Sequence, residues 1–279
     1  MITYTATPVS PDAYTLGEGP IWDPLRERLL WVDIQAGKVF AGRVSPFAVL
    51  ESWSFDSVAA AVAVAENGTL LVATADSLVR VDRDGKRTTL ARVLFSDASR
   101  LNDGGVDPDG RYLIGSMSLS EKSGSEILVR FENGELTTID DDLTLSNGLA
   151  WVGDQLYSID STPQVVYGRT YPDGPRRELF RVEAGLPDGM CADRDGNLWI
   201  AAHGAGRVER RSPAGELLAV VEVAASQPTS VAFAGPQLDV LVITTATDGL
   251  DAPAEHDGRI FTTAVETAGL LTPYWNPAL

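Results

Sequence analysis

Cysteine, basic residues and long apolar runs are all scarce in this sequence. Its 279 residues include one cysteine, Cys191, which cannot form an internal disulfide. The first residues have neither a basic segment nor an apolar segment of the kind that opens a secretory signal. The longest apolar run, residues 58–65, is far shorter than the roughly 20 residues that a membrane helix needs. We therefore expect a soluble protein in a reducing, cytoplasmic location.

Basic side chains are too few to balance the acidic ones. Lys and Arg number 22 against 39 Asp and Glu, which gives a formal net charge of −17. Binding to nucleic acid or to anionic lipid depends on Lys and Arg that displace counterions. The sequence therefore predicts no nucleic-acid or membrane partner, and we infer no protein partner from it.

Several catalytic motifs are also missing. No long segment shows the periodicity of an amphipathic helix. The chain has no GxSxG elbow, no HExxH pair, no CxxC pair and no phosphate-binding P-loop. It does have 26 glycines, 16 prolines and an ordinary hydrophobic content of 44%. This balance is typical of many short strands that are joined by tight turns around a sizeable core. We predict an all-β fold.

One pattern recurs along the chain: a polar or small residue, a short apolar segment, a turn with Gly or Asp, and a second apolar segment. Successive copies are 41 to 45 residues apart, which is the length of a four-stranded propeller blade. A β-sandwich would also give short strands, but not a constant long period. We predict one six-bladed β-propeller domain over residues 1–279, and we expect the segment before Leu16 to pair with the last blade. The copies begin at Glu18, Ala60, Asn102, Asn147, Asp188 and Thr229.

These six first positions, which we call the axial ring, should face one another. The first strand of every blade lines the central channel of a propeller, so equivalent positions meet around the axis. Four of the six carry side-chain oxygen acceptors, and such groups are costly side by side unless a cation lies between them. An all-oxygen set suits calcium, magnesium or manganese, and the carboxylates leave zinc possible. The alternative is a polar ring that only borders a water-filled channel.

Five segments taken together suggest a family. GEGPIWD, RLNDGGVDPDGRY, LSNGLAW, LPDGMCADRDGNLWIA and PTSVAFAGPQLD occur in order, and the chain from about Leu16 into the final blade resembles the senescence marker protein, regucalcin and gluconolactonase family. The resemblance implies a six-bladed propeller with a single metal, calcium before the other divalent ions. It implies that Glu18, Asn147 and Asp188 hold this metal.

The same resemblance implies a substrate site beside the metal. In the family, the Arg and Asn of the RxND motif are associated with holding substrate in the channel mouth, and here they are Arg100 and Asn102. Glu121, in the stretch GSMSLSEKSGS, is an approximate match to a further substrate-binding residue. Asp188 resembles the family's proposed general base, although activation of the water by the metal is the alternative.

The predicted function is metal-dependent hydrolysis of a sugar lactone to its aldonic acid. Three protein ligands leave coordination positions open, which is typical of a catalytic metal site. The alternatives are a hydrolase of another small ester and a non-catalytic calcium-binding or interaction propeller. Only one Trp-Asp dipeptide occurs, at Trp22, so a WD40 scaffold is poorly supported.

Other noticeable residues have ordinary structural interpretations. The Asp-x-Asp-Gly runs that begin at Asp82, Asp107 and Asp193 lack the spacing to a terminal Glu that a calcium-binding EF-hand loop requires, so we predict hairpin turns. His203 could face the channel, but an isolated histidine is more often structural. Cys191 has no base near it in the sequence and is expected to be a small buried side chain.

Overall fold

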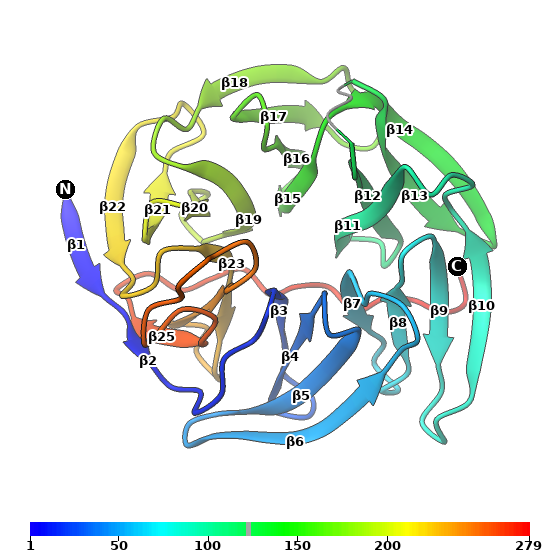
Figure 1. Cartoon of the computed structure of the whole chain (residues 1–279). Helices are drawn as coiled ribbons and strands as arrows, with labels where there is room; N and C mark the ends of the chain where they lie inside the picture. Colours follow the sequence, from blue (N-terminus) through cyan, green and yellow to red (C-terminus); the bar gives the residue numbers. More distant parts are fainter. Residues whose placement is uncertain (121–123) are drawn as a thin grey trace.

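Six sheets surround a central axis in the computed structural model, which describes residues 1–120 and 124–279 (Figure 1). The described residues contain strands, turns and loops but no helix. None of them therefore forms a helix long and apolar enough to cross a membrane. This arrangement confirms the six-bladed β-propeller predicted from the repeat.

Each of the first three blades is an antiparallel sheet of four strands in chain order, and its first strand, here called the inner strand, lies nearest the axis (Figure 1). Blade 1 contains β3 (Gly17–Asp23), β4 (Arg28–Asp33), β5 (Lys38–Val44) and β6 (Phe47–Ser54). Blade 2 contains β7 (Ala61–Val64), β8 (Leu70–Ala73), β9 (Ser77–Val81) and β10 (Arg87–Arg92). Blade 3 contains β11 (Ser99–Val106), β12 (Tyr112–Ser118), β13 (Glu126–Glu132) and β14 (Glu135–Leu143).

The last three blades repeat this order, and the fifth and sixth each gain a strand from the start of the chain. Blade 4 contains β15 (Ser146–Val152), β16 (Gln155–Asp160), β17 (Val165–Thr170) and β18 (Arg177–Arg181). Blade 5 contains β19 (Leu186–Ala192), β20 (Leu198–His203), β21 (Arg207–Arg211) and β22 (Leu217–Glu222). Blade 6 contains β23 (Pro228–Ala234), β24 (Val240–Thr245) and β25 (Phe261–Ala264).

The start of the chain closes the circle. Strand β2 (Thr7–Pro8) pairs with β25 and supplies the fourth strand of blade 6, as expected for the segment before Leu16. Strand β1 (Ile2–Thr5) instead lies parallel to β22 at the outer edge of blade 5. The first residues therefore connect two neighbouring blades, and the sequence predicted only the pairing with blade 6.

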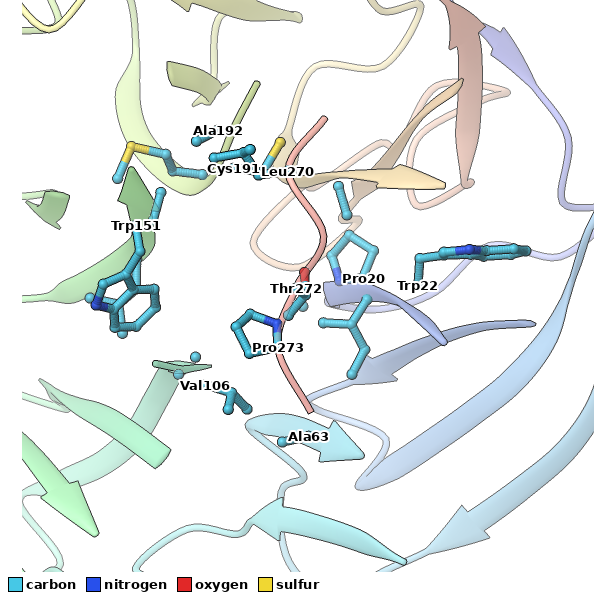
Figure 2. Close-up of a pocket in the computed structure, with 18 of the residues that line it drawn as sticks. Pro20, Trp22, Ala63, Val106, Trp151, Cys191, Ala192, Leu270, Thr272 and Pro273 are labelled. Atoms are coloured by element: carbon cyan, nitrogen blue, oxygen red, sulfur yellow. The ribbon is translucent and has the colours of Figure 1, made fainter. Parts of the chain in front are cut away.

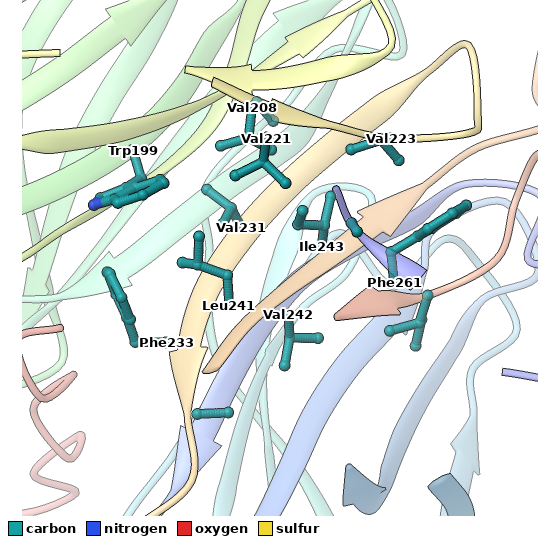
Figure 3. Packing of buried hydrophobic residues seen from close by; sticks show 14 of the residues in the cluster. Trp199, Val208, Val221, Val223, Val231, Phe233, Leu241, Val242, Ile243 and Phe261 are labelled. Carbon is teal, nitrogen blue, oxygen red and sulfur yellow. The ribbon is translucent and has the colours of Figure 1, made fainter. Parts of the chain in front are cut away.

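The hydrophobic core lies between neighbouring blades. Figure 3 shows Trp199, Val208 and Val221 of blade 5 packed toward residues of blade 6 such as Val231 and Phe233. The rings of Trp199 and Phe233 meet edge to face, with centroids 5.9 Å apart. Because side chains alternate across a strand, both faces of each blade are buried by its neighbours, which holds the inner strands in place around the axis.

Five of the six inner strands are irregular at or next to their axial ring residue. The pairing of each with the second strand of its blade shifts register after Glu18, Leu101, Asn147, Pro187 or Pro228. A β-bulge of this kind turns side chains away from the regular alternation, and bulges are common next to active sites. The bulges therefore allow polar side chains to face the axis while the rest of each strand packs in the core.

Two glycines after ring residues allow neighbouring inner strands to approach closely. A Cβ at Gly148 would lie 2.7 Å from the backbone oxygen of Asp188, and one at Gly189 would clash with the side chain of Ser230. The Asn-Gly and Asp-Gly pairs at these positions are therefore packing features rather than turns.

The Asp-x-Asp-Gly runs form hairpin turns, as predicted. Asp107 accepts a hydrogen bond from the backbone N–H of Asp109 at 3.0 Å, and Asp193 accepts one from Asp195 at the same distance. Gly85, in the run that begins at Asp82, has a φ of 83° and bonds back to Asp82, which completes the turn. These carboxylates stabilise turns and lie outside the axial ring.

The C-terminal tail, residues 266–279, crosses the propeller from blade 6 toward blades 2 and 3, a path that Figure 1 shows in red. The backbone N–H of Leu270 donates to Ala192, and that of Trp275 donates to Val64. Trp275 is only 2% exposed and packs in the cluster that contains Val106 and Tyr112. The tail therefore connects opposite sides of the ring of blades.

Replacing Trp275, which anchors the tail, should destabilise the propeller. We expect Trp275→Ala to lower the free energy of unfolding by about 3 to 5 kcal/mol, because a large buried side chain leaves a cavity. Thr272→Ala, at an exposed position of the same tail, should cost less than about 0.5 kcal/mol. Denaturant unfolding of both variants measures this difference. A loss below about 1 kcal/mol for Trp275→Ala would show that the tail is not an anchor.

Candidate functional site

The inner strands bring four oxygen-bearing residues of the axial ring together. Glu18 comes from β3, Asn102 from β11, Asn147 from β15 and Asp188 from β19, and these inner strands contact their neighbours around the axis. Glu18, Asn102 and Asn147 are 7%, 8% and 4% exposed, and Asp188 is half-buried. The cluster of acceptors predicted from the repeat is therefore present.

The other two ring positions do not add to this cluster. Ala60 carries no polar atom. Thr229 is fully buried and its hydroxyl donates to the backbone oxygen of Gly17, while sharing a 2.9 Å hydrogen bond with the hydroxyl of Thr244. Thr229 thus connects blade 6 to blade 1.

Negative charge at the axis is poorly compensated. Burial raises the pKa of Glu18 well above its usual range, and the nearby carboxylates of Asp188 and Asp103 raise it further. Burial likewise raises the pKa of Asp188, Asp103 adds to this effect, and Asn147 and Glu18 act against it. The guanidinium of Arg100 favours ionisation of both carboxylates, but it is a single cation. The site therefore favours a proton or a further cation between the acidic side chains.

The amide of Asn147 is held with its oxygen free. Its Nδ2 donates to the hydroxyl of Ser161 at 3.0 Å, and that hydroxyl donates to the backbone oxygen of Pro187 at 2.6 Å. The Oδ1 atom of Asn147 is buried and has no hydrogen-bond partner among the residues that the structure describes. A buried carbonyl oxygen without a donor costs about 1 to 3 kcal/mol, so a cation or a donor beside this atom would be favourable.

This donor set fits a hard divalent cation. The side chains of Glu18, Asn147 and Asp188 offer oxygen only, the ligand type that calcium and magnesium prefer. In the described part of the chain, no three His, Cys, Asp or Glu residues are arranged as a metal cluster. A metal at the axis would therefore depend on the amide oxygen of Asn147 as its third protein ligand.

Asn102 makes different contacts from Asn147. Its Oδ1 accepts a 2.8 Å hydrogen bond from Nη1 of Arg100, and its Nδ2 donates to the backbone oxygen of Ser146 at 3.0 Å. The carbonyl of Asn102 is therefore already used by Arg100. Arg100 is itself 8% exposed, so Asn102 holds a buried guanidinium in place.

Two predictions on single residues have different outcomes. Glu121 lies outside the described residues, and the structure says nothing of its position. Cys191 is half-buried and not fully buried as expected, and burial raises the pKa of its thiol. A thiol in this environment is a poor nucleophile, in agreement with the interpretation of the sequence.

Asp103 is an acidic residue at the axis that the ring of equivalent positions did not include. It follows Asn102 in the register shift of β11, which places two consecutive side chains near the axis. Burial raises its pKa to about 6, against a hydrogen bond from the backbone N–H of Gly104 at 2.7 Å. The repeat could not reveal Asp103, because a bulge breaks the correspondence between sequence position and strand face.

His203 and Asp248 are further groups near Arg100. His203 is the last residue of β20 and half-buried, and burial lowers its pKa while Asp248 acts against this. The carboxylate of Asp248 also acts against the burial that lowers the pKa of Arg100, and it accepts a 3.2 Å hydrogen bond from Nε2 of Gln35. Burial therefore favours the neutral form of His203, which lies near the carboxylate of Asp248.

A propeller whose axis carries buried carboxylate and amide oxygens defines the class of this protein, and comparison with known proteins gives the family. A family model described as SMP-30/Gluconolactonase/LRE-like region matches residues 16–247. The chain therefore belongs to this family, which confirms the resemblance seen in its motifs.

Individual relatives agree with this assignment. The chain is 33% identical over 261 residues to regucalcin of Xenopus laevis, with 87% of each chain covered. It is 35% identical over 269 residues to pentonolactonase XacC of Haloferax volcanii, with 91% of this chain and 89% of that protein covered. The structure of the calcium-binding protein regucalcin from Agrobacterium tumefaciens superposes with a TM-score of 0.91 at 25% identity, over 99% of both chains.

The raised pKa of Glu18 predicts how stability depends on pH without metal. Its carboxyl group binds protons more tightly in the folded protein than in the unfolded chain, where the pKa is about 4. Metal-free protein should therefore lose stability as pH rises from about 4 toward 7. We expect Glu18→Gln to raise the free energy of unfolding at pH 7.5 by about 1 to 3 kcal/mol in chelator, because a buried charge is removed.

Thermal unfolding at pH 4 and pH 7.5 measures this effect, with Glu66→Gln as the matched control at an exposed position. The gain should shrink at pH 4, where Glu18 is already protonated. A Glu18→Gln variant that is less stable than the parent at pH 7.5 in chelator would contradict the assigned electrostatics.

Proposed function

We propose that this chain is a metal-dependent lactonase that hydrolyses a sugar lactone to its aldonic acid. The observation that carries the proposal is the buried, unpartnered Oδ1 of Asn147 beside the two carboxylates of Glu18 and Asp188. A pentonolactonase among the relatives supports the choice of substrate class. The calcium-binding regucalcin among the solved structures supports a divalent cation.

Glu18, Asn147 and Asp188 would hold the metal, with calcium expected before magnesium, manganese or zinc. A divalent cation in this position supplies Lewis acidity that polarises the lactone carbonyl and stabilises the negative charge that develops on its oxygen. The protein contributes a fixed amide, because Ser161 holds Asn147 in orientation before any ligand arrives.

Asp188 is the proposed general base. In hydrolysis, a water attacks the carbonyl carbon of the lactone and loses a proton, and the bond between that carbon and the ring oxygen breaks. Asp188 accepts the proton and returns it to the departing ring oxygen, which becomes the hydroxyl of the product acid. The burial of the site and the neighbouring carboxylate of Asp103 raise the pKa of Asp188 and make it a better proton acceptor than an exposed aspartate, although Asn147 and Glu18 act against this.

Arg100 and Asn102 are the proposed substrate-binding residues, together with Glu121. The guanidinium of Arg100 is held by Asn102 through one nitrogen, Nη1, which leaves other N–H groups for sugar hydroxyls or for the product carboxylate. The carboxylate of Asp248, which acts on Arg100, and its hydrogen-bond donor Gln35 add further polar groups to this environment. A polyhydroxylated lactone suits such an environment better than an apolar ester does.

We further propose that the whole chain is one propeller domain that acts in the cytoplasm on a small soluble substrate. The lone cysteine supports a reducing compartment, and the net charge of −17 disfavours nucleic acid and anionic membrane surfaces.

Turnover of aldonolactones tests the proposed function directly. We expect chelator-stripped protein to lose activity and one of calcium, magnesium, manganese or zinc to restore it. Asn147→Ala should lose at least about 100-fold in metal affinity and in kcat/KM, because a ligand and its fixed geometry are both removed. Asn67→Ala, in an exposed hairpin turn, is the control. Tight metal binding without turnover of any lactone would favour another ester or a binding protein.

Replacing Arg100 should weaken the binding of the lactone and strengthen the binding of the metal. We expect Arg100→Gln to raise KM about tenfold or more, because charged hydrogen bonds to the substrate are lost. The same change should tighten metal binding, since a cation near Glu18 and Asp188 is removed. Steady-state kinetics and calorimetric metal titration measure the two effects. Weaker metal binding in Arg100→Gln would show that Arg100 supports the metal site rather than the substrate.

A further inference from the structure

A second cavity opens on the same axis, beyond the axial ring. This lower cavity has a volume of about 370 Å³ and lies between the later halves of the inner strands and the C-terminal tail. Figure 2 shows Trp151 and Val106 on one side, Cys191 and Ala192 on another, and Thr272 and Pro273 of the tail crossing between them and Pro20. The cavity is therefore bounded by inner strands of several blades and by the tail.

The lower cavity borders the proposed metal site, because Gly19 and Asp103, which follow Glu18 and Asn102 in the chain, are among its lining residues. On β3 and β19, the ring residues Glu18 and Asp188 precede the cavity residues Ile21 and Cys191 by three positions. These cavity residues lie beyond the register shifts of the two strands and therefore farther along the axis than the ring residues. Arg100, Asn102 and Asn147 are not among the residues that line the cavity. The two sites are therefore neighbours on the axis, and Asp103 is close to both.

The walls of the lower cavity are mostly apolar and carry one carboxylate. Ile21, Trp151 and Met190 are among the apolar side chains, and no Lys, Arg, His or Glu of the described residues lines the cavity. Asp103 is the one acidic residue in the wall. An apolar lining with a few polar groups is typical of small-molecule sites, and the volume exceeds the 150 Å³ or so of an engineered cavity that binds benzene.

The tail leaves a path of entry to the cavity. Leu270 and Trp275 hydrogen bond to the blades through their backbone N–H groups, whereas residues 271–274 make no backbone hydrogen bond to the blades among the described residues. Leu271 is 50% exposed. Tyr274 is held to blade 1 through its hydroxyl, which donates to Asp23 at 2.8 Å, so residues 271–273 are the least tethered part of the tail and the place where we expect a ligand to enter.

We propose that the lower cavity is a second ligand site, which takes a small uncharged aromatic or alicyclic molecule that carries one hydroxyl group. The apolar walls bind the ring by excluding water from it. The carboxylate of Asp103 accepts a hydrogen bond from the hydroxyl and repels anions, which excludes the aldonic acid product and other carboxylates. The site is therefore selective for molecules unlike the proposed sugar substrate.

Binding of two matched probes tests this site. Benzyl alcohol should bind the full-length protein saturably with one site in calorimetry at pH 8, and benzoate should bind about tenfold more weakly or not at all because of Asp103. Bound benzyl alcohol should also slow alkylation of Cys191, which lines the cavity and is the single cysteine of the chain. Absence of saturable benzyl alcohol binding up to its solubility limit would overturn the proposal.

A filling variant shows whether the probe sits in the lower cavity. Ala232 lines the cavity and is 6% exposed, so Ala232→Leu should weaken benzyl alcohol binding at least about tenfold by occupying the space. Ala264→Leu, at an exposed end of β25 outside the cavity, should bind like the parent. If Ala232→Leu does not fold, Ala63→Met fills the wall from blade 2 with a more adaptable side chain. Unchanged binding in a folded filling variant, or equal binding of benzoate, would refute the site.

Discussion

Uncompensated oxygen atoms at the propeller axis are the constraint on which the rest of this structure depends. Glu18 and Asp188 carry carboxylates whose pKa values are raised by burial and by the nearby charge of Asp103, and Asn147 presents a buried oxygen with no donor among the described residues. Such an arrangement costs folding free energy, and the packing between blades must offset it. Large side chains such as Trp199 fill the space between blades, and Gly148 and Gly189 allow the inner strands to approach closely enough for the oxygens to converge. The polar groups at the axis therefore lower the stability of the propeller, and the packing of the same inner strands between the blades offsets this cost.

The sequence allowed the fold to be predicted because a blade repeats about every 42 residues, and it predicted most of the axial cluster because equivalent positions meet at the axis. Glu18, Asn102, Asn147 and Asp188 were found in this way. What could not be predicted depends on departures from the repeat. Asp103 reaches the axis through a bulge, β1 joins blade 5 through a parallel pairing, and the tail occurs once in the chain. Local periodicity carries no signal for any of these features.

The two ends of the propeller axis differ in polarity. The first residues of the inner strands include the polar ring residues Glu18 and Asp188, whose charges, like that of Asp248, act on Arg100. The later residues of these strands are mostly apolar and line the lower cavity together with the tail. Asp103 belongs to both regions, since its charge acts on Glu18 and Asp188 and it also lines the lower cavity. A single set of six strands can therefore present a proposed cation site to one side and an apolar cavity to the other, because alternation and bulges decide which side chains face the axis.

The most direct test is a crystal structure of the protein grown with manganese and measured for anomalous scattering. Manganese takes the oxygen ligands that calcium and magnesium prefer, and its anomalous signal locates the ion without reference to the protein atoms. We predict one strong peak on the axis, within coordination distance of Glu18, of Asp188 and of Oδ1 of Asn147. An axis without an anomalous peak, in which a donor or a water satisfies Asn147, would contradict the proposed metal centre.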